Sequence, residues 1–244
     1  MSANVKLEKD PNNEEEREKV DEKVYQELIG YLLYVALHSR PDIAYAVNIL
    51  SQFSKDPRKQ HYNAALQVIR YLSTTRNAAI IYKKNSAPLM GFCDANWAQD
   101  INDRKSQTGF CFLLAGGAVT WESKKQKVVA HSSAEAEYIA LTESAKEASY
   151  LSYILEELGL FNGKPIKIHT DSQSAQKMAE FGSHHSRIKH IHYKYHYIKD
   201  TIQNGVVELR YLPTQDMLAD VLTKPVPKPK HIYCSNNMGI KLNC

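Results

Sequence analysis

Four acidic residues in different sequence contexts could together support metal-dependent chemistry on phosphate esters. Asp94 follows the apolar run Leu-Met-Gly-Phe-Cys, and Asp171 follows Ile-Lys-Ile-His-Thr. Glu135 opens an amphipathic segment, and Asp220 lies in the short run Met-Leu-Ala-Asp-Val-Leu-Thr-Lys. Four carboxylates in one pocket repel one another unless divalent cations lie between them, which is the arrangement used for two-metal phosphoryl chemistry. The four residues are therefore a candidate metal site.

Each of these acids also has an ordinary structural explanation when taken alone. Asp94 can end a strand, Glu135 can favour a helix N-terminus by its charge, and Asp171 can cap a helix. However, adjacent parallel strands would bring Asp94 and Asp171 to the same carboxyl edge of a sheet, where ligands bind in α/β proteins. Asp220 has apolar neighbours, so its carboxylate needs a partner or a metal. The ordered set favours one shared site.

Composition sets broad limits on the class of protein. The chain has 244 residues, 43% hydrophobic and 24% charged, which is typical of a globular protein. Its net charge of +4 is too small to establish a nucleic-acid partner. Neither a membrane-spanning run nor a secretory signal is visible, so we expect no membrane partner. The cysteines form no C-x-x-C pair, and Cys93 and Cys111 are expected to be buried, reduced thiols.

Hydrophobic periodicity divides the chain into four parts. Residues 1–23 are polar and acidic, which predicts a disordered leader. Residues 24–77 show three helical segments separated by Arg40-Pro41 and Asp56-Pro57, a block expected to pack on another element. Residues 78–224 alternate between strand and helix patterns. After the prolines at 225, 227 and 229, residues 225–244 are predicted to form a loose tail.

The third part carries the fold. Strands are predicted at 89–93, 109–114, 118–121, 166–169 and 206–212, with a further strand-like run at 78–82. Helices are predicted at 133–158, 172–180, 189–203 and 216–223. Three antiparallel strands followed by alternating helices and strands indicate an α/β fold with a mixed five-stranded sheet flanked by helices.

Several polar residues are candidates for nucleic-acid contact. Phosphate contacts are suggested for a cluster of basic residues: Arg104, Lys105, Lys124, Lys125 and Lys127. A solvated turn explains them equally well, and Ser106 and Thr108 can add hydroxyl contacts or simply serve that turn. The His-rich stretch 184–196 has no cysteine or ordered acid to complete a zinc site, so a basic, aromatic surface and plain packing are the better explanations.

Long ordered stretches carry a resemblance to a known family. They are Tyr-Gln-Glu-Leu-Ile-Gly-Tyr-Leu-Leu-Tyr (25–34), Arg-Pro-Asp-Ile-Ala-Tyr-Ala-Val (40–47), Asp-Arg-Lys-Ser-Gln-Thr-Gly (103–109), Ser-Ser-Ala-Glu-Ala-Glu-Tyr (132–138), Lys-His-Ile (189–191) and Leu-Ala-Asp-Val-Leu-Thr-Lys (218–224). Between residues 24 and 224 the chain resembles the carboxyl-terminal end of copia-type retrotransposon Pol polyproteins. The resemblance implies a ribonuclease H-like fold, preceded by the helical end of a reverse transcriptase.

The same resemblance implies a set of site residues. The catalytic and metal-binding carboxylates would be Asp94, Glu135, Asp171 and Asp220. Glu135 is preferred to Glu137 because the apolar spacing after it fits the family helix. Asp220 is preferred to Asp216 because the Ala-Asp-hydrophobic-Leu-Thr-Lys context surrounds Asp220.

The implied activity is hydrolysis of the RNA strand of an RNA–DNA hybrid with two Mg²⁺ ions, Mn²⁺ being an alternative, and no small-molecule cofactor. Ser132, Ser133 and Gln173 are candidate contacts to the RNA 2′-hydroxyls. The implied partners are the hybrid and the rest of the reverse transcriptase. The implied location is a cytoplasmic virus-like particle, with the nucleus as the other compartment to test.

Two departures and two alternatives accompany this interpretation. No histidine stands in Leu212-Pro213-Thr214-Gln215, before the last acidic helix, and no Tyr-x-Asp-Asp polymerase motif occurs, so the chain alone should not synthesise DNA. One alternative is a non-catalytic, nucleic-acid-binding remnant of a retroelement. The other, a resolvase- or transposase-like nuclease, is disfavoured by the flanking stretches.

Overall fold

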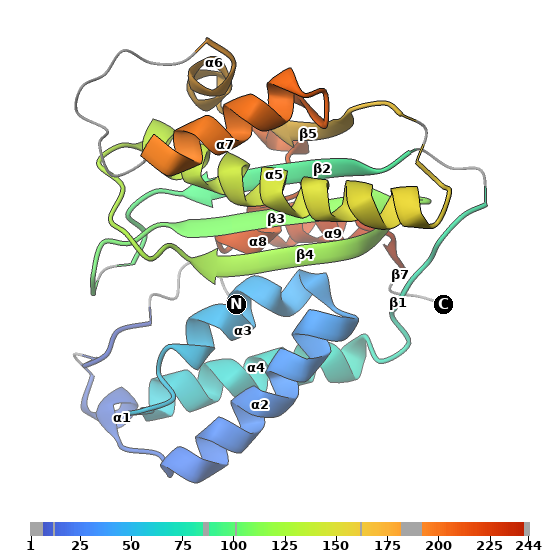
Figure 1. Cartoon of the computed structure of the whole chain (residues 1–244). Helices are drawn as coiled ribbons and strands as arrows, with labels where there is room; N and C mark the ends of the chain where they lie inside the picture. Colours follow the sequence, from blue (N-terminus) through green and yellow to red (C-terminus); the bar gives the residue numbers. More distant parts are fainter. Residues whose placement is uncertain are drawn as a thin grey trace.

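A mixed five-stranded sheet with helices on both faces positions the rest of the molecule (Figure 1). The computed structural model describes residues 7–11, 13–84, 88–100, 102–161, 163–181 and 192–241, without the side chains of residues 181 and 192–196. The strand order is β4-β3-β2-β5-β6. The strands are β2 (Met90–Asn96), β3 (Gln107–Leu114), β4 (Gly117–Lys125), β5 (Ile166–Thr170) and β6 (Val207–Tyr211). β3 runs antiparallel to β2 and β4, whereas β5 runs parallel to β2 and β6. The predicted mixed sheet is confirmed.

Local sequence explains how the strands connect. Ala115 and Gly116 both have positive φ, +54° and +80°, and join β3 to β4 through a two-residue turn that follows the sheet twist. The parallel strands need longer crossovers. The first is α5 (Ser133–Glu157), and the second contains α6 (Gln173–Phe181) and α7 (His192–Gln203).

The two faces of the sheet bury different side chains. On one face, covered by α5, α6 and α7, Cys93, Phe110 and Phe112 belong to a core that includes Tyr138 of α5. On the other face, the next residues along the strands pack against α8 (Asp220–Thr223) and α9 (Lys228–Asn237), among them Cys111. Cys93 and Cys111 are buried free thiols, as predicted.

The predicted helix 216–223 is instead a 3-10 turn, Thr214–Asp216, followed by α8. Among the described residues, no helix combines the length and apolar character needed to cross a membrane.

The helical block lies beside β4 and has its own apolar core. It consists of α2 (Glu22–His38), a 3-10 turn (Pro41–Ile43), α3 (Ala44–Ser51) and α4 (Lys59–Thr74). The Trp121 indole N–H donates to the carbonyl of Ala36 over 2.8 Å. The Gln107 amide donates to Asn48 over 3.0 Å. These contacts fix the block against the sheet, as expected for a helical unit that packs on another element.

The leader is folded onto the helical block, which corrects the prediction of disorder for its described residues. It contains α1 (Glu14–Arg17), and Leu7 is 7% exposed within the apolar core of the block. His61 Nε2–H donates to the Glu8 carbonyl over 2.9 Å, and Lys59 pairs with Glu18 over 2.9 Å. The acidic character that predicted disorder instead serves capping and ion pairing at the block.

The tail is also ordered, which corrects the prediction of a loose end. Residues 228–237 form α9, and β7 (Ile240–Lys241) pairs antiparallel with β1 (Ala79–Ile80). Cys234, Met238 and Ile240 are fully buried. Pro229 lies in the first turn of α9, where the missing N–H of proline has no cost, so the prolines begin a helix here. Residues 242–244 lie outside the described part.

Candidate active site

Three carboxylates meet at the sheet edge where β2 and β5 end. Asp94 lies near the end of β2, Asp171 directly follows β5, and Glu137 comes from the second turn of α5. One carboxylate oxygen from each lies within 4.8 Å of the others. The prediction that Asp94 and Asp171 share an edge is confirmed, and parallel pairing of β2 with β5 is the reason.

Glu135 is not part of this cluster, which corrects the choice made from the sequence. Ser132 is the N-cap of α5, and its hydroxyl accepts the Glu135 backbone N–H over 3.2 Å. The Glu135 carboxylate in turn accepts the backbone N–H of His131 over 2.8 Å. This pair resembles a capping box, for which Ser-Ser-Ala-Glu is the sequence signature, except that Glu135 binds the N–H of the residue before the N-cap. That signal could have assigned Glu135 to the helix end and left Glu137 for the site.

Glu137 has surroundings that suit a metal ligand. The side chain is 8% exposed and accepts a hydrogen bond from the backbone N–H of Ala95. Its Oε2 atom is buried and has no hydrogen-bond partner. Because a buried carboxylate oxygen without a partner costs free energy, its retention beside two further carboxylates indicates a place for a cation.

Asp220 lies next to the cluster and is connected to it by a lysine. The Asp220 side chain is 5% exposed, and its Oδ1 lies 2.7 Å from the Lys224 ammonium. The same ammonium lies 3.5 Å from Asp94 Oδ2. The Thr223 hydroxyl donates to that Asp94 oxygen. The predicted fourth carboxylate is therefore close to Asp94, but a cationic side chain lies between them.

A glycine allows α8 to approach this edge. Gly109 pairs with Asp94 across β2 and β3. A Cβ atom on Gly109 would lie 2.7 Å from side-chain carbons of both Leu222 and Thr223, closer than real Cβ contacts. The glycine that ends Asp-Arg-Lys-Ser-Gln-Thr-Gly thus permits α8, with Asp220, to lie against Asp94.

A second layer holds Asp171 and Asp220. The Thr214 hydroxyl donates to Asp171 Oδ2 over 2.7 Å. From α9, the Lys230 ammonium donates to the carbonyls of Thr214 and Gln215 over 3.0 and 2.6 Å. It also lies 3.5 Å from Asp220 Oδ2. The tail helix therefore helps to orient two carboxylates of the site.

Burial and mutual repulsion shift the proton affinities of the cluster. Burial raises the pKa of Asp94 to about 6, although Lys224 acts against this. Burial, followed by the charges of Asp94 and Asp171, raises the pKa of Glu137 well above its usual range. Burial alone would lower the pKa of Lys224, but Asp94 and Asp220 outweigh it, so the pKa lies above its ordinary value. The cluster thus has an excess of negative charge that a cation would relieve.

The donor set fits a hard divalent cation. Asp94, Glu137 and Asp171 supply only oxygen ligands, which Mg²⁺ and Mn²⁺ accept and which do not favour zinc. The orphaned Glu137 oxygen and the raised pKa values point the same way. These residues would hold the ion, and Asp220 lies close to Asp94, joined to it through the Lys224 ammonium.

The predicted nucleic-acid contacts divide into exposed and internal side chains. Two hydroxyls, those of Ser106 and Thr108, are internal, which favours the alternative that they serve the turn over contact with nucleic acid. Ser106 is fully buried and accepts the Ala98 backbone N–H over 3.2 Å, and Thr108 accepts the Gln126 amide over 2.9 Å. These bonds hold the loop after β2 and the end of β4.

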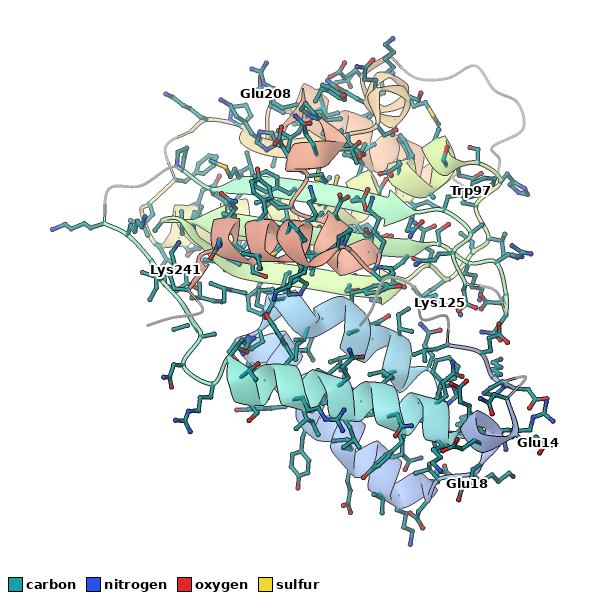
Figure 2. All side chains as sticks on the ribbon, turned by 180° about the vertical axis from the view of Figure 1, so that it is seen from behind. Glu14, Glu18, Trp97, Lys125, Glu208 and Lys241 are labelled. Atoms are coloured by element: carbon teal, nitrogen blue, oxygen red, sulfur yellow. The ribbon has the colours of Figure 1, made fainter. Side chains whose placement is uncertain are left out.

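The basic residues also differ from one another. The Lys125 ammonium pairs with Asp100 and Asp103 at the junction with the helical block, where Figure 2 labels Lys125, and its role in phosphate contact stays a prediction. Lys105 is half-buried near Asp103. The predicted contacts that face solvent are Arg104, Lys124, Ser132, Ser133 and Gln173. The side chains of the His-rich stretch 184–196 lie outside the described part, and its role stays a prediction.

The chain is similar in sequence to known retrotransposon polyproteins. It is 38% identical over its whole length to the retrovirus-related Pol polyprotein from transposon TNT 1-94 of Nicotiana tabacum, of which it covers 18%. It is 38% identical over 90% of its length to that from transposon RE1 of Arabidopsis thaliana, and 31% identical over 88% to the Ty1-JR1 Gag-Pol polyprotein of Saccharomyces cerevisiae. Over most of its length the chain is therefore homologous to retrovirus-related Pol polyproteins of plant and yeast transposons, as the resemblance to the copia-type family implied. It spans less than a fifth of the length of these polyproteins. No protein-family model matches it.

The fold is the ribonuclease H-like fold that the family resemblance implied. Its mixed five-stranded sheet, flanked by helices and preceded by a helical block, is the basis for this assignment. Solved structures similar to the chain include RNase H1 from Halobacterium salinarum, 16% identical over 56% of this chain and 95% of that one, with a TM-score of 0.42. Another is LC11-RNase H1 in complex with an RNA/DNA hybrid, 13% identical over 55% and 93%, with a TM-score of 0.41.

Proposed function

We propose that this Pol polyprotein segment hydrolyses the RNA strand of RNA–DNA hybrids with divalent metal ions, Mg²⁺ in the first instance. The observation that carries the proposal is the cluster of Asp94, Glu137 and Asp171, whose carboxylate oxygens lie within 4.8 Å of one another at the sheet edge. Asp220 is the fourth carboxylate, next to Asp94. With divalent cations bound, such a cluster can support chemistry on a phosphate ester. Without cations, the repulsion between its carboxylates destabilises the folded protein.

The residues of the chain act by binding and orienting. When bound, the metal ions would activate the attacking water and stabilise charge on the scissile phosphate. Asp94, Glu137 and Asp171 hold that charge at a fixed place because Thr223, the Ala95 N–H and Thr214 each bind one carboxylate. Rigid orientation of this kind is what places a reacting group in productive geometry.

The substrate and setting belong to the same proposal. Exposed Arg104 and Lys124 are candidate phosphate contacts, and Ser133 and Gln173 are candidate contacts to RNA hydroxyls at the N-terminal ends of α5 and α6. The helical block is the end of the reverse transcriptase, whose remaining parts would hold the rest of the hybrid. We propose the cytoplasmic virus-like particle as the compartment.

The decisive test compares two glutamates of one helix. Glu137→Gln should lower Mg²⁺-dependent cleavage of the RNA strand of a labelled hybrid by at least about 100-fold, since it removes charge from the metal cluster. Glu135→Gln should cleave at a rate near that of the wild type and lose only about 0.5–1 kcal/mol of stability from its weakened cap.

Both variants keep a side chain of similar size, so circular dichroism should show both folded. Equal loss of cleavage in both variants would contradict the assignment of Glu137. A folded wild type that binds the hybrid without cleaving it would instead identify a non-catalytic nucleic-acid-binding protein.

A further inference from the structure

Lys224 occupies an unusual position for a lysine. Its ammonium lies 2.7 Å from Asp220 Oδ1 and 3.5 Å from Asp94 Oδ2, between two side chains that are 5% and 2% exposed. Asp94 therefore belongs to two groupings. It lies with Glu137 and Asp171 in the carboxylate cluster, and its Oδ2 lies beside the Lys224 ammonium, which is paired with Asp220.

The backbone fixes this position. Lys224 is the C-cap of α8, and its N–H donates to the Asp220 carbonyl over 3.1 Å. The preceding residue, Thr223, is fully buried and donates to Asp94. Leu222 is fully buried in the core on the same side of the sheet. Because α8 is anchored at each of these points, the Lys224 side chain starts from a fixed backbone position next to Asp94 and Asp220.

The space that Lys224 fills is the space that a cation shared by Asp94 and Asp220 would need. An ammonium within ion-pair distance of both carboxylates and a divalent ion bound to both exclude each other by size and by charge. With Lys224 in place, the group free to bind a divalent ion consists of Asp94, Glu137 and Asp171.

The Lys224 ammonium can also move from this position toward solvent. The Lys224 side chain is 30% exposed, unlike the two aspartates that it joins. Lysine has a long, flexible stem and a compact charge, and nucleic-acid phosphates attract such charges strongly. A hybrid placed at the cluster would bring a phosphate to the exposed side of this lysine.

We propose that Lys224 is a resident counter-cation that fills the second cation position, between Asp94 and Asp220, until substrate arrives. The substrate-free protein would then bind one divalent ion, and a second would enter only when the hybrid backbone draws the ammonium away. This inference rests on the proposed function, because it assigns the order in which that site is loaded.

Metal stoichiometry without substrate tests the proposal directly. We would titrate Mn²⁺ into the full chain and count bound ions by electron paramagnetic resonance and calorimetry. The wild type should bind one ion per chain at the cluster. Lys224→Met should bind two, with the affinity for the second ion raised by at least about tenfold, since a competing charge is removed.

Three controls isolate the position. Lys224→Arg keeps the positive charge and should bind one ion. Lys55→Met removes an exposed lysine of the helical block and should behave as the wild type. Lys224→Met combined with Asp220→Asn should return to one ion, because one of the two carboxylates is gone. If Lys224→Met fails to fold, Lys224→Gln, with a polar side chain in the same place, carries the test.

Unchanged stoichiometry and affinity in the folded Lys224→Met and Lys224→Gln proteins would overturn the proposal. So would binding of two ions by the wild type without substrate. Failure of the proposed function is a different result, in which Mn²⁺ binding does not depend on Glu137 or the wild type does not cleave a hybrid. A non-cleavable 2′-O-methyl hybrid should raise the wild-type stoichiometry from one to two, and no rise despite hybrid binding would overturn the proposed loading order.

Discussion

Glu135 and Glu137 of α5 have different partners because the helix turns by about 200° between them. Glu135 faces the N-terminal end of the helix and accepts the His131 N–H over 2.8 Å. Glu137 faces the sheet edge, where its Oε2 is buried without a partner. The helix geometry therefore separates a carboxylate that stabilises a helix end from one that destabilises the metal-free protein. Such local cost is common where a ligand is to be bound.

Asp94 should make the stability of the metal-free protein depend on pH. Its pKa is raised from 3.8 to about 6, mainly by burial. Between these values the folded protein binds more protons than the unfolded chain, so the stabilising contribution of protonated Asp94 is lost as pH rises through about 6. A pKa difference of this size corresponds to a change in the free energy of unfolding on the order of 3 kcal/mol.

Urea unfolding in EDTA, compared with Asp94→Asn, measures this contribution. We expect the wild type to lose stability relative to the variant between pH about 4 and about 7. Saturating Mg²⁺ should reverse the difference at neutral pH, since metal bound to the folded state stabilises it. A difference that does not change with pH would show that the Asp94 carboxylate is not desolvated as the structure indicates.

The sequence was sufficient for Asp94 and Asp171 but not for the glutamate. An aspartate at the end of an apolar run has its place fixed by strand direction, and parallel pairing then brings two such ends together. The choice between Glu135 and Glu137 depends on helix phase, which the packing of α5 on the sheet decides. The capping box of Ser132 and Glu135 was the one local signal for that phase.

At the scale of elements, α8 and α9 support the site from the face of the sheet opposite α5, which is the face toward the viewer in Figure 2. α8 carries Asp220 and Lys224, and α9 sends Lys230 to the carbonyls of Thr214 and Gln215. The apolar side of α9 packs in the same core as Cys111 and Leu222. The carboxyl-terminal helix therefore belongs to the folded unit that positions the site.

Substitution of Met238 tests whether the packing of α9 against the sheet stabilises the protein. The residue directly follows α9 and is fully buried. Met238→Ala should destabilise the chain by about 2–4 kcal/mol, because it leaves a cavity in a packed core. Exposed Asn236→Ala, two residues away, should change stability by no more than about 0.5 kcal/mol. Thermal and urea unfolding measure both, and two equally small effects would show that the tail does not contribute to the core.

The folded structure of the acidic leader and of the tail after Lys224 could not be predicted from composition. Prolines at 225 and 227 indicate a break, but Pro229 suits the first turn of a helix as well as a loop. Likewise the acidic leader lacks an apolar period, and its place depends on distant partners such as His61 and Lys59. Burial lowers the pKa of His61 to about 4, so the neutral ring accepts the Arg58 N–H and donates to Glu8. Long-range contacts of this kind leave no local signature.

At the scale of the whole molecule, the helical block and the sheet share hydrogen bonds as well as apolar contacts. The Gln99 amide donates to the Tyr45 hydroxyl over 3.0 Å, and the Lys125 ammonium donates to Gln52 over 3.0 Å. Ala44 of α3 lies in the core formed by β3 and α9. Because these contacts span the junction, unfolding of one part exposes surface of the other, and we expect a single cooperative unit.

Trp121 allows this expectation to be measured. Its indole donates to Ala36 at the junction, and Trp97 is the only other tryptophan of the chain. In a Trp97→Phe background, urea unfolding followed by Trp121 fluorescence and by far-ultraviolet circular dichroism should give the same midpoint. Adding Trp121→Phe should lower stability by about 1 kcal/mol through loss of one hydrogen bond, with circular dichroism still showing one transition. Two separate transitions, with part of the helical signal lost while Trp121 is still in its folded environment, would show that the block and the sheet are held together only weakly.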